Sequence, residues 1–266
     1  YYSNNFPNKY YLRPTVANRS RFENQYNAGG IKNDQYRGSG VTYKQVNGNW
    51  VLQKFLAGHE TSDKIHTNDV QITLYRAAEV HLFMIEALVG MGRFEEALAF
   101  LNNGVGSYYN ASAGKFNAPF EPYPSCLYRT SSTSELANRG VRGRVNLGEV
   151  GGFSLQSASA LDTLIAMRRL DSLLVEEISL ELAGEGKALY AMNRMLRKWS
   201  NEAPRNWAQR WIDASGGGNP AGLWGNEVQQ YWAKTVAAKY TDGLAIESKL
   251  AADKKNWFIT IDLKNR

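Results

Sequence analysis

The sequence of 266 residues has one cysteine, Cys126, and three histidines. A single cysteine can form neither an intrachain disulfide nor a CxxC metal or redox motif, and we expect Cys126 to be a small packing residue. His59, His66 and His81 form no HExxH motif and have no close metal-ligand spacing. The sequence therefore predicts neither a bound metal nor a cofactor.

Long apolar runs and clustered charges are also missing. No apolar stretch reaches the roughly 18–20 residues that a membrane-spanning helix requires. The formal net charge is +6, but the lysines and arginines are scattered rather than gathered into the basic stripe typical of nucleic-acid-binding proteins. We therefore expect no membrane-spanning helix and no nucleic-acid partner.

Motifs for common enzyme chemistry are absent as well. The sequence has no Gly-x-Ser-x-Gly nucleophile motif. The segment "GEGKAL" at 184–189 lacks both the third glycine of a dinucleotide fingerprint and the Ser or Thr of a phosphate-binding loop. These patterns predict a protein that is not an enzyme.

The N-terminal region, residues 1–70, is rich in asparagine, glycine and tyrosine and poor in leucine. Seven of the fifteen tyrosines fall within the first fifty residues. Short strands are predicted at 41–43 and 50–55, and the segment Asn47-Gly48-Asn49 between them is typical of a hairpin turn. We therefore expect loops and a few short strands here.

A helical pattern begins at Leu74, where apolar residues start to recur every three or four positions as far as Leu88. This first predicted helix ends near the glycines at 90–92. A second one begins at Phe94 and ends near 102–104. Residues 71–105 are thus predicted to form a helical hairpin, and "GRFEEAL" resembles the start of a second helix in a tetratricopeptide repeat.

The rest of the chain divides into three parts. Residues 106–157 form a long insertion that is either functional or packed onto a neighbouring element. Residues 158–200 contain predicted helices at 161–182 and 189–199, separated by glycines at 184–186. Residues 201–266 are rich in tryptophan and end in a predicted strand at 256–263. The whole pattern predicts a single, mainly α domain with tetratricopeptide-like helical hairpins, long irregular loops and a few short strands.

Two carboxylates, Glu181 and Glu185, lie four residues apart beside these glycines. A glycoside hydrolase needs two carboxylates across an open cleft, one of them with a raised pKa. The apolar, glycine-containing context favours another interpretation, in which the carboxylates hold helix ends together and pair with Arg142, Arg144 or Arg194.

Several segments resemble the C-terminal half of the SusD/RagB family of surface lipoproteins. The first is "YRAAEVHLFMIEAL", with Arg76, Glu79 and Val80 at the positions of an Arg-x-x-Glu-Val motif. The second is "NRGVRGRVNL", with Asn138, Arg142 and Arg144, and the third is "EEISLELAGEGKALYAMNRM", with Glu177, Glu181 and Glu185. "NRSRFENQY" around Arg21 is similar to a further family segment, and the resemblance covers about residues 20–199.

The resemblance implies a nutrient-binding protein on the extracellular face of the outer membrane, without catalytic residues. Its partners would be a SusC-like TonB-dependent transporter, an oligosaccharide or peptide ligand, and the N-terminal portion of the same protein. Residues 1–5 do not resemble a signal peptide, and we expect this chain to be the C-terminal part of a longer protein. A lipid anchor outside this chain would then be its only attachment to the membrane.

A ligand platform is predicted in the aromatic N-terminal region, because tyrosine and tryptophan faces stack on sugar rings and on extended peptides. Two alternatives remain open: a helical protein-interaction scaffold without a small ligand, and a glycoside hydrolase. The predicted ligand-binding residues are Tyr10, Tyr11, Tyr36, Tyr43 and Trp50.

Overall fold

The computed structural model describes residues 14–26, 29–30, 37, 39–46, 48–52, 54, 74–124, 139–151, 159–199, 233–234, 237 and 243–252. This part of the chain is mainly helical, as predicted. Its α-helices are α1 (Val16–Glu23), α2 (Ser39–Thr42), α3 (Ala77–Gly90), α4 (Phe94–Leu101), α5 (Gly140–Arg144), α6 (Ala160–Glu181), α7 (Ala188–Trp199) and α10 (Gly243–Ala252). Its strands are β1 (Tyr43–Val46), β2 (Asn49–Leu52), β3 (Tyr109–Asn110) and β4 (Lys115–Phe116), which form two antiparallel pairs.

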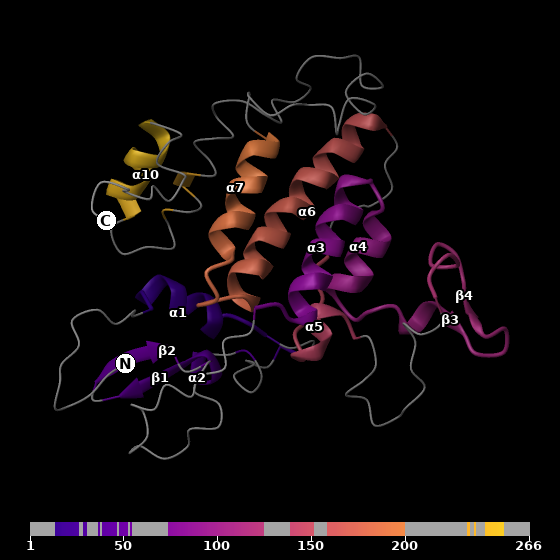
Figure 1. Cartoon of the computed structure of the whole chain (residues 1–266), viewed down its shortest axis with the longest axis horizontal. Coiled ribbons are helices and arrows are strands. Elements are labelled where there is room, and N and C mark those ends of the chain that lie inside the picture. The colour runs from indigo at the N-terminus through magenta and orange to yellow at the C-terminus, as the bar shows by residue number, and fades with distance from the viewer. Residues whose placement is uncertain are drawn as a thin grey trace.

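The long helices α3, α4, α6 and α7 lie side by side, with α6 in contact with both α3 and α7 (Figure 1). Helix α6 begins after Ser159, whose hydroxyl accepts a hydrogen bond from the backbone nitrogen of Asp162 at 3.1 Å. Helix α3 begins at Ala77 rather than at the predicted Leu74, because Arg76 has an extended backbone and serves as the N-cap. The predicted helices at 161–182 and 189–199 are confirmed within one residue, and the helix predicted from 94 to near 102–104 ends at Leu101.

The main core lies between these helices. Trp199, at the end of α7, is fully buried in it, and its indole nitrogen donates to the buried carboxylate of Asp171 on α6 at 2.8 Å. The apolar periodicity predicts part of this packing, since Leu82, Leu164 and Leu174 are buried as expected. Leu74 and Ile165 follow the same periodicity but are exposed. The largest buried side chains here are Leu82, Ile85, Phe100, Leu101, Leu164, Met167, Leu174 and Trp199.

A second, smaller core joins the N-terminal region to the end of α6. Phe22 of α1 and Tyr43 of β1 make an edge-to-face contact with ring centroids 5.4 Å apart, and they pack against Leu180 and Ala183. The hydroxyl of Tyr43 also donates to the side chain of Asn18. Burial of this tyrosine anchors the β1–β2 hairpin onto α6.

The predicted β1–β2 hairpin is confirmed, but its strands are displaced from the predicted positions. Strand pairing runs from Tyr43–Leu52 to Val46–Asn49, whereas strands were expected at 41–43 and 50–55. Residues 41–42 belong instead to α2. The observed register places the side chain of Tyr43 in the second core. The β-branched residues before it, Val41 and Thr42, favour a strand by propensity but do not indicate which side chain will be buried.

Part of the long insertion packs onto the helical core. Residues 106–124 contain a 3-10 turn and the β3–β4 hairpin, and their aromatic rings contact Phe100 of α4 and one another. Phe100 lies 6.0 Å from Phe120 and 5.6 Å from Tyr123, while Tyr108 and Phe120 are 4.3 Å apart. This part of the insertion therefore extends the core.

Helix α5 docks on the C-terminal end of α4 through the backbone. The nitrogen of Gly143 donates to the carbonyl oxygen of Asn102 at 2.8 Å. The side chain of Asn102 then bonds both the nitrogen and the oxygen of Val150, each at 3.0 Å. Gly140, at the start of α5, has a φ of +70° and lies directly against the same carbonyl group.

No helix in the described part of the chain combines the length and apolar character needed to cross a membrane. The predicted strand at 256–263 and the tryptophans at 207, 211, 224 and 232 lie outside the described residues.

Gly140→Ala should destabilise the fold by at least about 2 kcal/mol, because a methyl group would overlap the Asn102 carbonyl and because the φ value disfavours any residue with a Cβ. Urea denaturation followed by circular dichroism measures the free energy of unfolding. Gly90→Ala is the matched control: it lies in α3 with open space around the added carbon, and we expect it to leave stability unchanged or raise it by up to about 1 kcal/mol. Equal effects of the two variants would contradict the docking of α5 described here.

Candidate functional site

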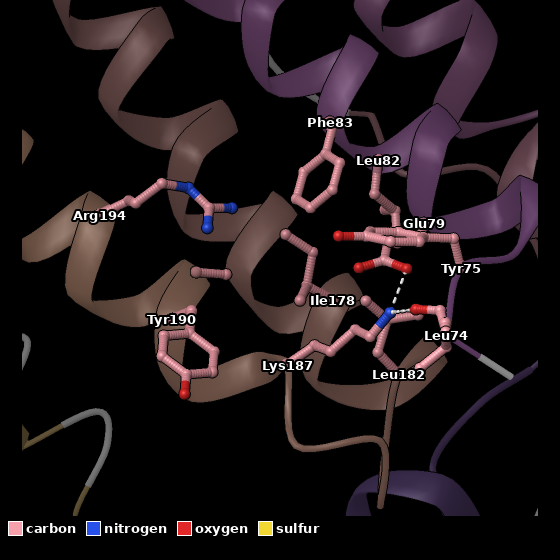
Figure 2. A pocket seen from close by; sticks show the side chains of 11 residues that line it. Leu74, Tyr75, Glu79, Leu82, Phe83, Ile178, Leu182, Lys187, Tyr190 and Arg194 are labelled. Atoms are coloured by element: carbon pink, nitrogen blue, oxygen red, sulfur yellow. Dashed lines mark hydrogen bonds and ion pairs between the residues drawn. The ribbon is translucent and has the colours of Figure 1, made fainter. Parts of the chain in front are cut away.

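A groove lies between α3 and α7, with a volume of about 520 Å³ (Figure 2). Its floor consists of apolar side chains that also belong to the core, and its rim carries aromatic side chains that are exposed to solvent. Tyr75 is 74% exposed and Tyr190 is 58% exposed. The lining residues are Leu74, Tyr75, Glu79, Leu82, Phe83, Ile178, Leu182, Lys187, Tyr190, Ala191 and Arg194.

A cation lies against an aromatic ring at each end of the groove. The ammonium of Lys187 is 4.7 Å from the ring centroid of Tyr75. It forms an ion pair with Glu79 and donates a hydrogen bond to the carbonyl oxygen of Leu74. At the other end, the guanidinium of Arg194 is 5.3 Å from the ring centroid of Phe83. One signal in the sequence indicates this site: Tyr75, Phe83 and Tyr190 are large apolar residues outside the three- and four-residue spacing that predicts the buried helix faces.

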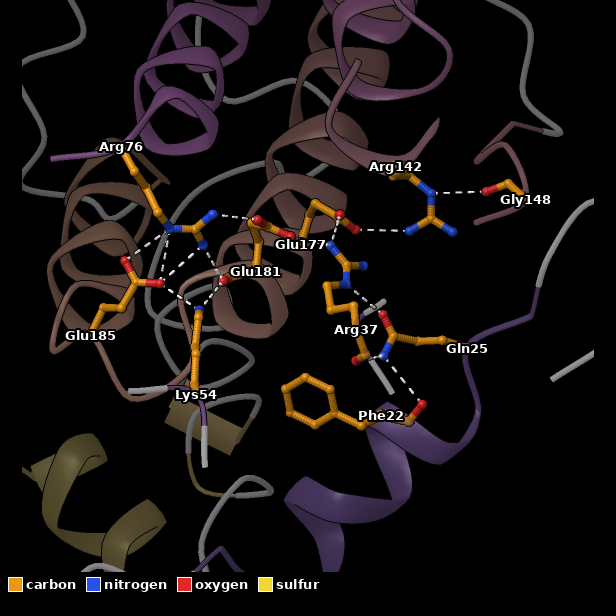
Figure 3. A network of polar contacts seen from close by, with 10 residues as sticks. All are labelled: Phe22, Gln25, Arg37, Lys54, Arg76, Arg142, Gly148, Glu177, Glu181 and Glu185. Carbon is orange, nitrogen blue, oxygen red and sulfur yellow. Dashed lines mark hydrogen bonds and ion pairs between the residues drawn. The ribbon is translucent and has the colours of Figure 1, made fainter. Parts of the chain in front are cut away.

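The second feature is a cluster of buried ion pairs at the end of α6 (Figure 3). Glu177 and Glu181 lie one turn apart on the last two turns of α6. Beyond the helix, Gly184 and Gly186 have φ values of +78° and +73° and turn the chain toward α7. This tight turn brings Glu185 back beside Glu181, so three carboxylates meet at one junction.

Arg76 connects the two carboxylates nearest the turn. Its guanidinium lies 2.6 Å from an oxygen of Glu181 and 3.0 Å from an oxygen of Glu185, and it donates to the carbonyl of Glu181. Lys54 pairs with Glu185 and donates to the same carbonyl at 2.6 Å. The two cations thus satisfy the carbonyl group of Glu181, the last residue of α6, and place positive charge at the negative end of the helix dipole.

Arg37 and Arg142 surround the remaining carboxylate. Arg37 pairs with Glu177 and lies 3.0 Å from Glu181. Its Nε donates to the side chain of Gln25 at 2.7 Å, which ties the N-terminal region to α6. Arg142 lies 2.8 Å from Glu177 and donates to the carbonyl of Gly148 at 2.9 Å. The cluster therefore joins α5, α6, the start of α3 and two N-terminal segments.

The charges of this cluster keep Glu181 and Glu185 ionised. Burial by itself would raise the pKa of Glu181, but Arg37 and Arg76 outweigh it and hold this pKa below its ordinary value of 4.5. Arg76 and Lys54 lower the pKa of Glu185 in the same way against the effect of burial. Burial in turn lowers the pKa of Lys54. The low pKa of both carboxylates is the opposite of what a glycosidase acid requires.

Glu181 and Glu185 thus pair with cations at the helix junction, as the preferred interpretation of the sequence predicted. Their side chains are only 10% and 5% exposed. The predicted partners were wrong, however: Arg142 binds Glu177, Arg194 binds Glu86, and neither carboxylate pairs with Arg144 in the described part of the chain. The actual partners come from segments more than a hundred residues away in sequence, which local spacing cannot indicate.

The predicted ligand platform is described only in part. Tyr43 is 6% exposed and belongs to the second core, which corrects the expectation that it presents a free ring. Trp50 is half-buried, and the guanidinium of Arg19 lies 4.7 Å from its ring centroid. The other three predicted residues, Tyr10, Tyr11 and Tyr36, lie outside the described residues.

Comparisons of the chain with protein-family models, with curated proteins and with solved structures give no match.

Glu181→Gln should destabilise the protein by about 3 kcal/mol, because it leaves buried positive charge without its full complement of partners. We place the effect at the low end of the usual range for broken buried pairs, since Arg37 and Arg76 each keep a second carboxylate. Urea denaturation at pH 7 measures this effect. The control is Glu121→Gln, which removes an exposed pair with Lys115 and should leave the unfolding midpoint nearly unchanged.

The stability of the wild-type chain should also fall in acid. Folding lowers the pKa of Glu181 and Glu185, so their ionised forms stabilise the folded state. This contribution to the free energy of unfolding is complete above about pH 5, and it is lost as the pH falls below 4.5 toward the lowered pKa values of the folded state. Glu181→Gln should flatten this loss in thermal melts between pH 3 and pH 6. A variant with the same acid sensitivity as the wild type would show that Glu181 does not contribute.

Proposed function

We propose that the chain is the C-terminal part of a nutrient-binding protein of the SusD/RagB type, which captures an oligosaccharide or a peptide at the cell surface. The observation that carries the proposal is the contact between the motifs that resemble this family. Arg76 from the first motif binds Glu181 and Glu185 from the third, and Arg142 from the second binds Glu177 from the third.

These contacts support the proposal because a chance resemblance of short motifs gives no reason for their residues to meet. Arg76 and Glu181 are 105 positions apart in sequence. Glu79, also from the first motif, pairs with Lys187 immediately beyond the glycine turn. The motif residues therefore share one structural role, which is to hold the start of α3, the end of α6 and α5 together.

The helical hairpin fits the same proposal. Helices α3 and α4 are in contact and are joined by a three-residue connection, and Arg93 and Glu96 of "GRFEEAL" form an ion pair at the start of α4. We infer that α3 and α4 form a tetratricopeptide-like unit. In the proposed assembly, such helices pack against a SusC-like TonB-dependent transporter and against the N-terminal portion of the same protein.

The ligand would bind the aromatic N-terminal region on the extracellular side of the outer membrane. A lipid anchor outside this chain would hold the protein there. Each stacked ring contributes about 1 kcal/mol beyond its buried area, so several rings must act together to give micromolar affinity. Tyr10, Tyr11, Tyr36 and Trp50 are the rings proposed for this platform, and the buried Tyr43 would position Trp50 through the β1–β2 hairpin.

Replacing Tyr10, Tyr11, Tyr36 and Trp50 together by alanine should weaken ligand binding by at least about 100-fold, because four stacking contacts are lost. The measurement is isothermal titration of the full-length protein against glycan and peptide panels, followed by titration of the variant with the best ligand. Unchanged circular dichroism and melting temperature would show that the variant still folds.

The matched control is Leu244→Ala, which trims an exposed apolar side chain on α10 and should leave the affinity unchanged. If the wild-type protein binds no member of either panel, nutrient capture is excluded. Full affinity in the fourfold variant would instead place the ligand elsewhere on the protein.

A further inference from the structure

The groove between α3 and α7 has features of a ligand site that the proposed function does not use. Its floor is apolar, with Leu82 and Ile178 buried in the core. Large side chains at its rim, Leu74, Tyr75 and Tyr190, are mostly exposed. Single exposed apolar residues are ordinary on protein surfaces, whereas several around one concave site indicate an interaction. A volume of about 520 Å³ also lies within the range of small-molecule sites.

Within the described residues, one edge of the Arg194 guanidinium has no partner at this groove. Its Nε and Nη2 bind the two oxygens of Glu86 at 2.9 and 2.8 Å. A guanidinium has a second edge, formed by Nη1 and Nη2, that can bind another carboxylate with two hydrogen bonds. Figure 2 shows this guanidinium extending from α7 toward Phe83 of α3. The guanidinium therefore lies next to an aromatic ring.

Lys187 adds a second donor at the other end. Its ammonium uses two of its three hydrogens on Glu79 and on the carbonyl of Leu74. Lys187 and Arg194 are seven residues apart, which corresponds to about two helical turns and about 10 Å along α7. Lys187 and Glu79 neutralise each other, and so do Arg194 and Glu86. The groove therefore offers a ligand the remaining N–H donors of two paired cations rather than a net positive charge.

An apolar floor between two donors selects the chemistry of the ligand. A sugar would turn hydroxyl groups toward Leu82, Ile178 and Leu182, where they would lose water and gain no hydrogen bond. A ring or branched aliphatic group fits such a floor, and a carboxylate attached to it would reach the cationic rim.

We propose that this groove binds a carboxylate attached to a large apolar group. The apolar group lies on the floor between α3 and α7, and the carboxylate binds the free edge of Arg194. The same chemistry occurs in a free aromatic or aliphatic acid and at the C-terminus of a peptide with a large apolar last residue. This inference goes beyond nutrient capture at the N-terminal platform and does not depend on it.

The test uses N-acetyl-phenylalanine and its uncharged amide, titrated into the full chain with NMR chemical shifts or calorimetry as the readout. The acid should bind, and the amide should bind about tenfold more weakly, because it lacks the charge-assisted pair with Arg194. N-acetylglycine, which keeps the carboxylate but has no ring, should not bind measurably. Equal affinities for acid and amide, or no binding of the acid up to 10 mM (roughly the limit for a weak site), would overturn the proposal.

Two variants locate the site. Arg194→Gln should bring the affinity for the acid down to that for the amide, and Phe83→Ala should weaken both. Lys115→Gln makes the same change of charge on the distant β4 strand and should change neither affinity. Acid binding that survives Arg194→Gln in full overturns the assignment. If Arg194→Gln does not fold, the comparison of acid and amide on the unchanged protein decides alone.

Peptides distinguish the two sources of the carboxylate. A hexapeptide ending in phenylalanine that binds more tightly than the free acid identifies peptide C-termini as the natural ligand class. A free acid that binds as well or better identifies small acids. The fourfold Tyr10, Tyr11, Tyr36 and Trp50 variant should keep acid binding in full, so that failure at the platform and failure at the groove are separate results.

Discussion

Three carboxylates meet at the C-terminal end of α6, where the helix dipole already places partial negative charge. Glu177, Glu181 and Glu185 would repel one another there, and their burial adds a desolvation penalty. The arrangement is stable only with cations in direct contact. Arg37, Lys54, Arg76 and Arg142 supply them, and each comes from a different segment. The charge at one helix end thus determines which parts of the chain must come together.

The groove between α3 and α7 depends on the same junction. Leu74 and Tyr75 immediately precede Arg76, and Lys187 follows Glu185 by two residues. When Arg76 binds Glu185, the start of α3 and the start of α7 are held next to each other. The pair between Lys187 and Glu79 then closes that end of the groove. The buried cluster of ion pairs therefore also shapes the solvent-exposed groove beside it.

Sequence reasoning succeeded where structure follows from neighbours in the chain. The apolar periodicity of α6 and α7 and the glycines between them predicted two helices and a tight turn, since each of these depends on local contacts. The partners of Glu181 and Glu185 could not be predicted in this way. Arg76 and Lys54 reach them across more than a hundred residues, and the sequence offers nearer arginines that fit equally well by charge.

The aromatic residues illustrate the same limit for the functional sites. Tyr43 lies in a region rich in loops, where little demand from the core was expected, yet Phe22, Leu180 and Ala183 enclose it. Tyr75 lies just before α3 and Tyr190 lies on α7, next to the main core. Both rings remain exposed, because the core beneath them is already filled by Leu82 and Ile178. Aromatic density along the chain therefore does not by itself show which rings of a region are exposed. The relevant property is whether the nearest core still has space for the ring, and that depends on contacts between segments.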